Sequence, residues 1–368
     1  MPAGENVVLR GVNWLGDAVM STPALQRLRE AKPGAHITLL THEKLADLWQ
    51  GHPSIDAVMT FNSSAGLLGT ARRLRAERFD IAVVFPNSIR SALEVFLAGV
   101  PVRIGRGGNG RAHLFTHPVP ADRDAVRMRK RSRAEIERRI AANLQRETFP
   151  LSAHHSHQYL QLVGAMGANP LPVPPLLHVS DAEVANARAR FYPGNGSPLF
   201  ALNPGAEYGP AKRWPAERFI EAAVQLHHEV RCRWVVVGGA ADRVVAESIV
   251  SEVRKRIPQA AITSIAGQTS LRELCAVLKS CALILTNDTG PMHVAAALGI
   301  PVIAPFGSTS SELTGPAFAG NLAHQIIVGD VPCAPCFQRE CPIDFRCMKS
   351  ISVERITVAV RRALPRGR

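Results

Sequence analysis

Three short polar segments each follow an apolar run, and they carry the side chains best suited to chemistry. One of them, TNDTGPMH at 286–293, opens a helical pattern whose first turn contains Pro291. Free N–H groups at a helix start bind anions, and Thr289 and His293 would add donors there. A simple helix cap by Asp288 or Thr289 is an equally good interpretation of this segment alone.

The second segment runs from Asn203 to Pro215 and follows the apolar run Leu199–Leu202. Its glycines allow the backbone to approach a ligand closely, and Lys212 could neutralise a phosphate as a point charge. A surface loop with an exposed Lys-Arg pair is the commoner outcome for such a sequence. Ligand binding is favoured only because the Asp288 segment follows another predicted strand of the same half.

The third segment, GVNWLGD at 11–17, follows the first apolar run, Asn6–Arg10. It is not a P-loop, because Asp17 stands where a lysine would be needed. An acid at a helix start is stabilised as the carboxylate, so Asp17 could be a simple cap. The alternative is a general base at the edge of a ligand-binding cleft.

The elements that would position these segments are short apolar runs alternating with helical patterns. Runs this short and this apolar are typical of strands buried on both faces of a parallel sheet, and the βαβ pattern occurs in both halves. The predicted strands are Asn6–Arg10, Ile37–Leu40, Ile81–Phe85, Leu199–Leu202, Trp234–Val237, Leu283–Leu285 and Pro301–Pro305. The predicted helices include Asp17–Arg29, Ala216–Glu229, one after Ser270, Pro291–Leu298 and Ser352–Leu364.

A chain of 368 residues exceeds one hydrophobic core, and a Pro- and Gly-rich stretch separates its halves. We predict a first domain over 1–175, a linker over 176–195, a second domain over 196–350 and a C-terminal helical segment over 351–368. Two doubly wound domains would place a cleft between the carboxyl ends of their strands, where ligands usually bind.

The composition excludes several classes of protein. An apolar fraction of 46% and a charged fraction of 20% are those of a folded globular protein. No apolar run reaches the roughly 18 residues of a membrane span, and the N-terminus lacks a secretory pattern, so we expect a cytoplasmic protein. The net charge of +13 favours anionic partners such as a phosphorylated substrate, an anionic membrane or nucleic acid.

Together the three segments resemble the motif blocks of the bacterial ADP-heptose:lipopolysaccharide heptosyltransferases. NWLGDA at 13–18, GAEYGPAKRWP at 205–215 and DTGPMH at 288–293 stand in the family's order, and the second block is most similar to the heptosyltransferase II branch. The resemblance implies a GT-B architecture of two Rossmann-like domains, with the acceptor on the first and the nucleotide-sugar donor on the second. It also implies a C-terminal helix that packs back toward the first domain.

The resemblance further implies inverting, metal-independent transfer of L-glycero-D-manno-heptose from ADP-heptose to the first heptose of the lipopolysaccharide inner core, with no cofactor. Asp17 matches the family's general base. Acceptor contacts are expected from Asn13, Arg103 and Arg106. Donor contacts, from the diphosphate to the adenine, are expected from Lys212, Asp288, Thr289, Gly290, His293, Asp242, Gly267 and Thr269.

A basic stretch from Arg103 to Arg146 contains twelve arginines and lysines, more than we expect from the family at this point. Such a charge run is usually a solvated helical face. The alternative is a clamp for the phosphates of the lipid acceptor or for the inner membrane surface, which would make the protein peripheral at that membrane. We expect no nucleic-acid partner, because no nucleic-acid-binding motif is present.

Four cysteines, Cys333, Cys336, Cys341 and Cys347, lie within fifteen positions. Their number suits a structural Zn²⁺ or an iron–sulfur centre, although the spacing is not that of a standard zinc ribbon. We favour reduced thiols beneath the C-terminal helix and predict no metal.

Other functions stay open at this point. A nucleotide-sugar epimerase, or a GT-B glycosyltransferase with another acceptor, would share the Asp288 segment. A non-catalytic basic module that binds phosphorylated glycolipid would need the charges of 103–146 but not Asp17. An NAD-dependent enzyme is disfavoured, because no G-x-G-x-x-G opens either half.

Overall fold

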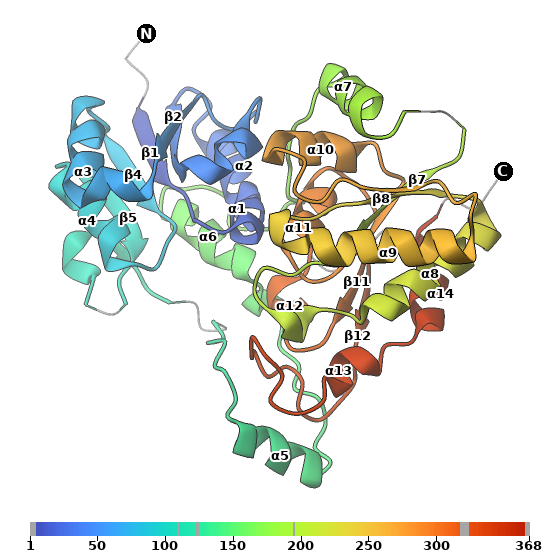
Figure 1. Cartoon of the computed structure of the whole chain (residues 1–368). Helices are drawn as coiled ribbons and strands as arrows, with labels where there is room; N and C mark the ends of the chain where they lie inside the picture. The colour runs from blue at the N-terminus through green and yellow to red at the C-terminus, as the bar shows by residue number, and fades with distance from the viewer. Residues whose placement is uncertain (1–4, 109, 122–124, 194–195, 317–323, 365–368) are drawn as a thin grey trace. The chain divides into compact units, whose positions relative to one another are not determined.

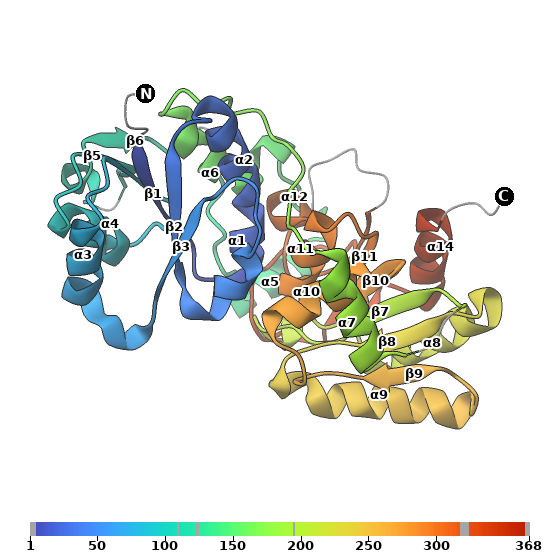
Figure 2. The same ribbon diagram turned by 90° about the horizontal axis from the view of Figure 1, so that it is seen from above.

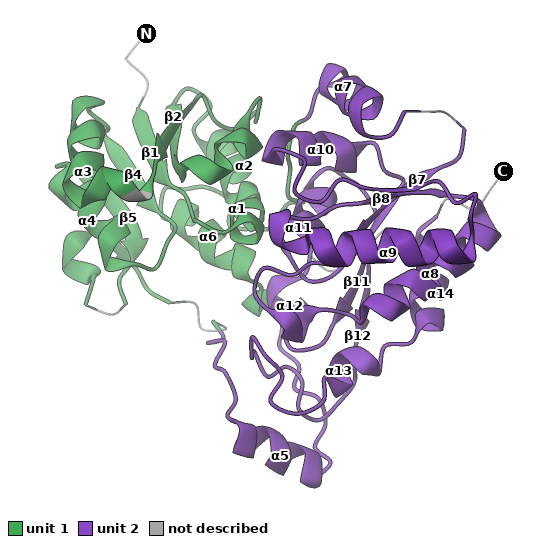
Figure 3. Cartoon of the chain, viewed as in Figure 1, with its two compact units in different colours: residues 1–125, 152–178 green, residues 126–151, 179–368 purple. Residues whose placement is uncertain are grey.

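Each half of the chain forms a six-stranded parallel sheet covered by helices, which confirms the predicted α/β class (Figure 1). The computed structural model describes residues 5–108, 110–121, 125–193, 196–316 and 324–364. It separates into unit 1, residues 1–125 and 152–178, and unit 2, residues 126–151 and 179–368 (Figure 3). The chain therefore passes from one unit to the other three times, whereas the sequence predicted one change of domain.

Unit 1 has the strand order β3-β2-β1-β4-β5-β6. Its helices form two groups on the two sides of the sheet (Figure 2). Helix α3 packs against α4 in one group, and α1 and α2 pack against α6 in the other. The strands are β1 Asn6–Arg10, β2 His36–His42, β3 Ala57–Phe61, β4 Ile81–Val84, β5 Val102–Arg106 and β6 His117–Val119. The helices are α1 Leu15–Met20, α2 Thr22–Ala31, α3 Gly66–Ala76, α4 Ile89–Leu97 and α6 His155–Gly164, with 3₁₀ turns η1 Glu43–Trp49, η2 Ser63–Ala65, η3 Ala112–Leu114 and η4 Leu151–Ala153.

The predicted helix Asp17–Arg29 is two helices in the structure. Helix α1 ends at Met20, and α2 begins at Thr22 with Pro23 in its first turn. Proline cannot donate a backbone hydrogen bond, so it fits the start of a new helix better than the interior of a continuous one. The break leaves Asp17 in the first turn of a short helix that directly follows the loop after β1.

Unit 2 has the strand order β12-β11-β10-β7-β8-β9. Helix α8 packs against α9 and α14, while α10 packs against α7 and α11. The strands are β7 Leu199–Asn203, β8 Arg233–Val236, β9 Ile262–Ser264, β10 Leu283–Thr286, β11 Val302–Phe306 and β12 Gln325–Val328. The helices are α5 Arg133–Ala141, α7 Asp181–Phe191, α8 Ala216–Val230, α9 Arg243–Arg256, α10 Leu271–Lys279, α11 Gly290–Ala297, α12 Ser311–Thr314, α13 Arg346–Lys349 and α14 Val353–Ala363, with 3₁₀ turns η5 Pro210–Lys212 and η6 Ala240–Asp242.

The segment 126–151, which the sequence analysis assigned to the first domain, belongs to unit 2 because it docks on the cysteine-bearing loop of that unit. Arg131 donates to the carbonyl of Cys333 at 3.0 Å, and Ile136 of α5 packs against the side chains of Cys333 and Cys336. Arg146 forms an ion pair with Glu312 at 2.8 Å. These contacts join the inserted helix α5 to unit 2.

The C-terminal helix α14 packs within its own unit. Ile356, Ala359 and Val360 lie in the buried core shared by α8 and the sheet, and Arg361 forms an ion pair with Glu229 of α8 at 2.7 Å. The implied packing of this helix toward the first domain stays a prediction. Across the described parts of the chain, no helix is long and apolar enough to cross a lipid bilayer.

Candidate functional site

The two predicted ligand-binding loops of unit 2 start side by side at the carboxyl edge of its sheet. Strands β7 and β10 are neighbours, and their last residues, Asn203 and Thr286, are paired in register. The Asn203 amide donates to the Thr286 hydroxyl at 3.0 Å. The loop that carries Lys212 and the loop that carries Asp288 therefore leave the sheet from adjacent points.

Asn287 ties these two loops together, a role that the sequence analysis did not assign. Its side chain is fully buried. Its oxygen accepts from the Trp214 N–H at 2.9 Å, and its amide donates to the carbonyls of Pro204 at 2.8 Å and Gly205 at 3.3 Å. One buried amide thus fixes both ends of the Lys212 loop against the β10–α11 turn.

Lys212 and Asp288 meet in a largely buried ion pair. The Lys212 Nζ lies 2.6 Å from the Asp288 Oδ2, and the two side chains are 14% and 4% exposed. Thr309 donates its hydroxyl to the same carboxylate oxygen at 2.6 Å. The ammonium also lies 5.0 Å from the centroid of the Tyr208 ring. These contacts hold one cation and one carboxylate in fixed positions beside the start of α11.

The start of α11 keeps the geometry of an anion site. Thr289 is the N-cap residue in extended conformation, and within this described helix its side chain makes no capping hydrogen bond. Asp288 contacts Lys212 and Thr309 instead, so the simple capping interpretation does not describe these side chains. Helix α11 begins at Gly290, so its first N–H groups and the positive end of its dipole face the turn between β10 and α11. His293 lies buried in the second turn.

Asp242, expected near the ribose, lies against the same loop. Its carboxylate accepts from the Gly239 N–H at 3.0 Å and packs so closely on Gly205 that a Cβ there would overlap it. Gly267, expected near the adenine, has a φ of +70°, and a Cβ there would lie 2.8 Å from the Ala240 Cα. The structure therefore gathers Asp242, Gly267 and the Lys212 loop, with Thr269 directly before the N-cap of α10.

The loop that carries Cys333, Cys336 and Cys341 packs against the Lys212 loop. The sequence did not reveal this contact. The Tyr208 hydroxyl donates to the carbonyl of Phe337 at 2.9 Å, and the Ala211 N–H donates to the carbonyl of Arg339 at 2.9 Å. Gly209, with a φ of +150°, leaves no room for a Cβ beside that same carbonyl of Arg339.

All four clustered cysteines line one small cavity of unit 2, together with Arg346. Burial raises the pKa of the Cys333 thiol to about 11 and that of Cys347 to about 12, so these thiols are neutral near pH 7. Among the residues that the structure describes, no three His, Cys, Asp or Glu side chains are grouped as metal ligands.

The residues expected to serve the acceptor lie at the carboxyl edge of the unit 1 sheet, with one exception. Asn13 is exposed in the loop after β1, where its oxygen accepts from the buried Arg10 at 3.3 Å. Asp17 is partly buried. Burial and the negative charge of Asp17 raise the pKa of Tyr159, for which no role was expected. Arg106, the last residue of β5, extends its guanidinium to α6.

Arg103 is the exception. It is the second residue of β5, far along the strand from the carboxyl edge that Arg106 occupies. Its guanidinium donates to the carbonyl of Leu114 at 2.9 Å and lies 5.4 Å from the centroid of the Phe96 ring. These contacts give Arg103 a structural role in joining β5 to the chain around η3.

The basic stretch separates into docked and exposed charges. Arg131, Arg139 and Arg146 make contacts within unit 2, with Arg139 donating to the carbonyl of Pro332 at 2.8 Å. Residues 122–124 lie outside the described residues. The exposed cations of this stretch that the structure describes in unit 2 are Arg127, Arg129, Lys130, Arg133 and Arg138.

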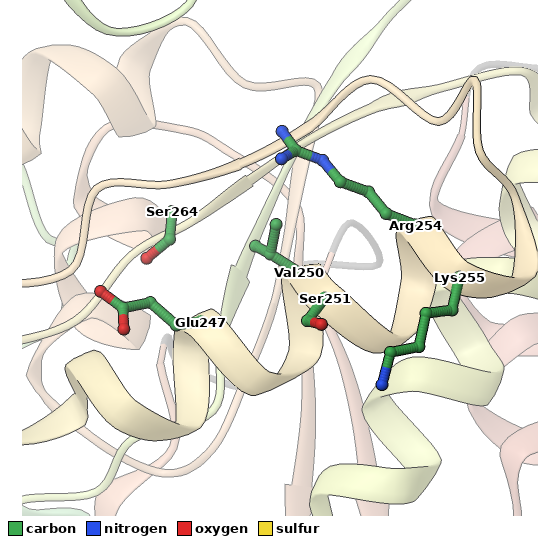
Figure 4. Close-up of a pocket in the computed structure, with 6 residues that line it drawn as sticks. All are labelled: Glu247, Val250, Ser251, Arg254, Lys255 and Ser264. Atoms are coloured by element: carbon green, nitrogen blue, oxygen red, sulfur yellow. The ribbon is translucent and has the colours of Figure 1, made fainter.

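An open depression over α9 and β9 contains none of the predicted site residues. Its lining includes Glu247 and Arg254 of α9 and Ser264 of β9 (Figure 4). The Arg254 guanidinium donates to the carbonyl of Ile262 at 2.7 Å, so this cation contributes to packing of α9 on β9. The buried ion pair of Lys212 and Asp288 lies in the loops at the carboxyl edge and not in this depression.

Comparison with known proteins places these motifs in a wider context. The family model for glycosyltransferase family 9 (heptosyltransferase) matches residues 68–345. Lipopolysaccharide heptosyltransferase 2 of Salmonella typhimurium and that of Escherichia coli are each 32% identical to this chain, over 84% of it and 85% of their own length. The solved structure of E. coli ADP-heptose lps heptosyltransferase II superposes with a TM-score of 0.77 at 27% identity, covering 97% of each chain.

Proposed function

The chain belongs to glycosyltransferase family 9, the heptosyltransferases, and we propose that it transfers L-glycero-D-manno-heptose from ADP-heptose to the first heptose of the lipopolysaccharide inner core. It is a glycosyltransferase of GT-B fold that acts in lipopolysaccharide biosynthesis, with the activity of the heptosyltransferase II type. We further infer that the transfer inverts the configuration at the sugar and needs no metal. The name of the E. coli relative supports ADP-heptose as the donor.

The fixed Lys212–Asp288 pair beside the start of α11 is the observation that carries the proposal. In the proposed reaction, the donor diphosphate is bound by Lys212, His293 and the first N–H groups of α11. Cleavage of the bond between the sugar and ADP increases the negative charge on that diphosphate, and preorganised donors stabilise such a charge most effectively. Asp288, held by Thr309, accepts hydrogen bonds from the hydroxyls of the donor sugar.

The remaining donor contacts come from residues beside the loop that carries Lys212. Asp242 accepts from the ribose hydroxyls, and the backbone of Gly267 to Thr269 borders the adenine. The close packing of Asp242 on Gly205 supports this assignment, because it brings the ribose-binding carboxylate to the loop that carries Lys212.

Asp17 of unit 1 acts as the general base. The acceptor O–H bond breaks as its proton passes to the Asp17 carboxylate, and the oxygen forms a bond to the anomeric carbon. The bond from that carbon to the diphosphate oxygen breaks, and its electron pair leaves with ADP. One displacement inverts the anomeric configuration, and the cations of unit 2 balance the leaving charge in place of a metal. Asn13 and Arg106 border the acceptor.

Mass spectrometry of the product from ADP-heptose and a truncated lipopolysaccharide that ends at the first heptose tests this function. We expect a gain of one heptosyl unit and one equivalent of ADP, with NMR reporting the inverted configuration. Free epimerised sugar would instead identify an epimerase. An acceptor that stays unmodified while the protein binds it would identify a non-catalytic glycolipid-binding module.

We also propose that the exposed face of segment 126–151 meets the phosphates of the acceptor or of the inner membrane surface. Its exposed cations Arg127, Lys130 and Arg138 make no ion pair among the described contacts. Exposed apolar side chains, Met128 and Leu144, lie in the same segment. Cations beside apolar side chains are the combination that binds anionic lipid surfaces.

A further inference from the structure

We propose that Trp14 is an acceptor-binding residue: a sugar ring of the acceptor stacks on its exposed indole, in the loop that leads to Asp17. This inference rests on the proposed function, in which unit 1 binds the acceptor and Asp17 is the general base. It concerns only unit 1, which contains Trp14 and every residue that supports it.

Trp14 is exposed to a degree that is unusual for tryptophan. The chain has four tryptophans, and Trp49, Trp214 and Trp234 are at most 3% exposed, whereas Trp14 is 52% exposed. Tryptophan is highly buried on average in folded proteins, because its ring is large and mostly apolar. An indole with half of its surface open contributes little to a core, so core packing does not account for a tryptophan here.

The loop that carries Trp14 lies at the carboxyl edge of the unit 1 sheet. Trp14 is the N-cap residue of α1, and Asp17 lies in the first turn of that helix. The preceding residue, Asn13, is also exposed, and Arg10, the last residue of β1, donates to its side-chain oxygen at 3.3 Å. Ligands of doubly wound domains bind outside the carboxyl ends of the strands. The exposed ring and the proposed base therefore share one short loop at the edge where a ligand is expected.

Lys44 restrains the indole ring. Its ammonium lies 5.3 Å from the centroid of the Trp14 ring, which is within the range of a cation–π contact. Lys44 belongs to the 3₁₀ turn η1, and its backbone N–H donates to Nδ1 of His42 at 3.2 Å. This contact restricts the ring while much of its surface stays open. A ring that is already restrained loses less conformational freedom when a ligand binds.

Three neighbouring strands anchor both segments of this contact. Arg10, His42 and Phe61 are the last residues of β1, β2 and β3, which are adjacent in the sheet. The guanidinium carbon of Arg10 lies 4.0 Å from the centroid of the Phe61 ring. The ring centroids of His42 and Phe61 are 5.3 Å apart. The loop after β1 and the turn η1 are thus attached to one stacked cluster at the sheet edge.

The surroundings of the ring suit a sugar better than a lipid surface. The face of an aromatic ring carries a negative partial charge, so it attracts the C–H groups on the face of a sugar ring as apolar area is buried. The exposed neighbours Asn13, Glu43 and Lys44 are polar and can bond to the hydroxyls around such a ring. An anionic membrane surface would repel Glu43.

Acrylamide quenching of tryptophan fluorescence tests this binding, because the other three tryptophans are buried. The probe is the lipid-free oligosaccharide of a truncated lipopolysaccharide that ends at the first heptose. We expect saturating oligosaccharide to lower the quenching constant of the wild-type protein toward that of Trp14→Phe. The quenching constant of Trp14→Phe itself should not respond to the oligosaccharide. A wild-type quenching constant that the oligosaccharide leaves unchanged would overturn the proposal.

Trp14→Leu tests whether the ring contributes to affinity, since it keeps an apolar side chain and removes the aromatic face. We expect the Kd of the oligosaccharide, and its KM in heptosyl transfer, to rise roughly 3- to 10-fold. The KM for ADP-heptose should not change, because the proposed donor contacts lie in unit 2. Trp14→Phe, which keeps a smaller ring, should lie between Trp14→Leu and the wild-type protein. Wild-type affinity for the oligosaccharide in Trp14→Leu would contradict the proposal.

Phe96→Leu is the matched control. Phe96 is 42% exposed, and the guanidinium carbon of Arg103 lies 5.4 Å from the centroid of its ring, so it is also an exposed aromatic residue beside a cation. It lies in the last turn of α4, where the chain approaches the start of β5 and not the carboxyl edge. We expect wild-type affinity for the oligosaccharide. An equal loss in Phe96→Leu and Trp14→Leu would show a general effect of removing an exposed ring, which contradicts the proposal.

The same quenching measurement separates this inference from other occupants and from the proposed function. Shielding of Trp14 by phosphatidylglycerol vesicles but not by the oligosaccharide would identify a membrane contact and overturn the proposal. Shielding that increases with protein concentration alone would identify a contact between copies, with the same consequence. If the wild-type protein transfers no heptose but the oligosaccharide shields Trp14, the proposed function fails and the sugar-binding assignment stands. If transfer occurs without shielding, the assignment of Trp14 fails alone.

Discussion

The ammonium of Lys212 lies 2.6 Å from a carboxylate oxygen of Asp288, and both side chains are largely buried. The two residues come from loops that follow neighbouring strands, so their pairing depends on the register of β7 with β10 and on the Asn287 bridge. The ion pair holds the Lys212 ammonium in place before the donor binds. Removing one partner would leave the other charge buried and uncompensated.

Lys212→Met should weaken ADP binding by roughly 10- to 100-fold, because a charged contact to phosphate is lost from a partly buried site. Thermal stability of unit 2 should also fall, since Asp288 would lose its cation. Isothermal titration calorimetry with ADP and a thermal melt measure the two effects. Lys349→Met, which removes an exposed lysine of the same unit, is the control. ADP affinity unchanged in Lys212→Met would contradict the donor assignment.

Asp17→Asn should lower turnover by about 10²- to 10⁴-fold, the range that a general base contributes, while ADP affinity stays at the wild-type value. The reason is that the amide cannot accept the acceptor proton, whereas the proposed donor site lies in unit 2. Single-turnover assays and ADP titration separate the two quantities. Asp47→Asn, in the 3₁₀ turn η1 of unit 1, controls for the loss of one negative charge. Wild-type turnover in Asp17→Asn would remove the base assignment.

The sequence predicted the central strands because their residues are apolar on both faces. Strands β1 and β10 are almost fully buried and were found within one residue of their bounds. The strands β3, β5, β6, β9 and β12 were missed. All five are short and only partly buried, so their few apolar residues mark them only weakly. The helix break at Ser21 was missed because the apolar pattern continues across it.

The site was predictable to the extent that its residues stand in contiguous motifs. Lys212 and Asp288 were chosen from two loops, and the structure places them in contact. Thr309 carries no local signal, because tertiary structure alone brings it to Asp288. The same holds for Asn287, whose three hydrogen bonds reach residues more than seventy positions away.

Stability should fall as the pH drops below about 6.5, in part because of His52. Its ring is buried, accepts from the Ser54 N–H at Nδ1 and contacts the Leu176 carbonyl through Nε2. Burial lowers the pKa of His52 from 6.5 to about 4. The unfolded chain therefore binds a proton that the folded chain excludes between these values, so this stabilisation is complete above pH 6.5 and is lost toward pH 4.

The expected contribution of His52 is about 3 kcal/mol across that window, to be measured by urea unfolding at pH 7.5 and pH 4.5. His52→Gln should show a smaller difference between the two pH values than wild type. Burial also lowers the pKa of His155 and His324 to about 4, so part of the dependence should persist in the variant. A variant with the full wild-type dependence would show that His52 does not contribute.

Replacing Arg127, Lys130 and Arg138 together with serine should weaken binding to anionic vesicles by roughly 100-fold, since each cation near such a surface contributes about 1 kcal/mol. Co-sedimentation with phosphatidylglycerol-containing and neutral phosphatidylcholine vesicles measures this, and added salt should reduce wild-type binding in the same direction. The control replaces three exposed cations elsewhere, Arg72, Lys255 and Arg256. If segment 126–151 is only a solvated face, the wild-type protein should bind both vesicle types equally, and both triple variants should behave like it. This result would contradict the proposed membrane contact.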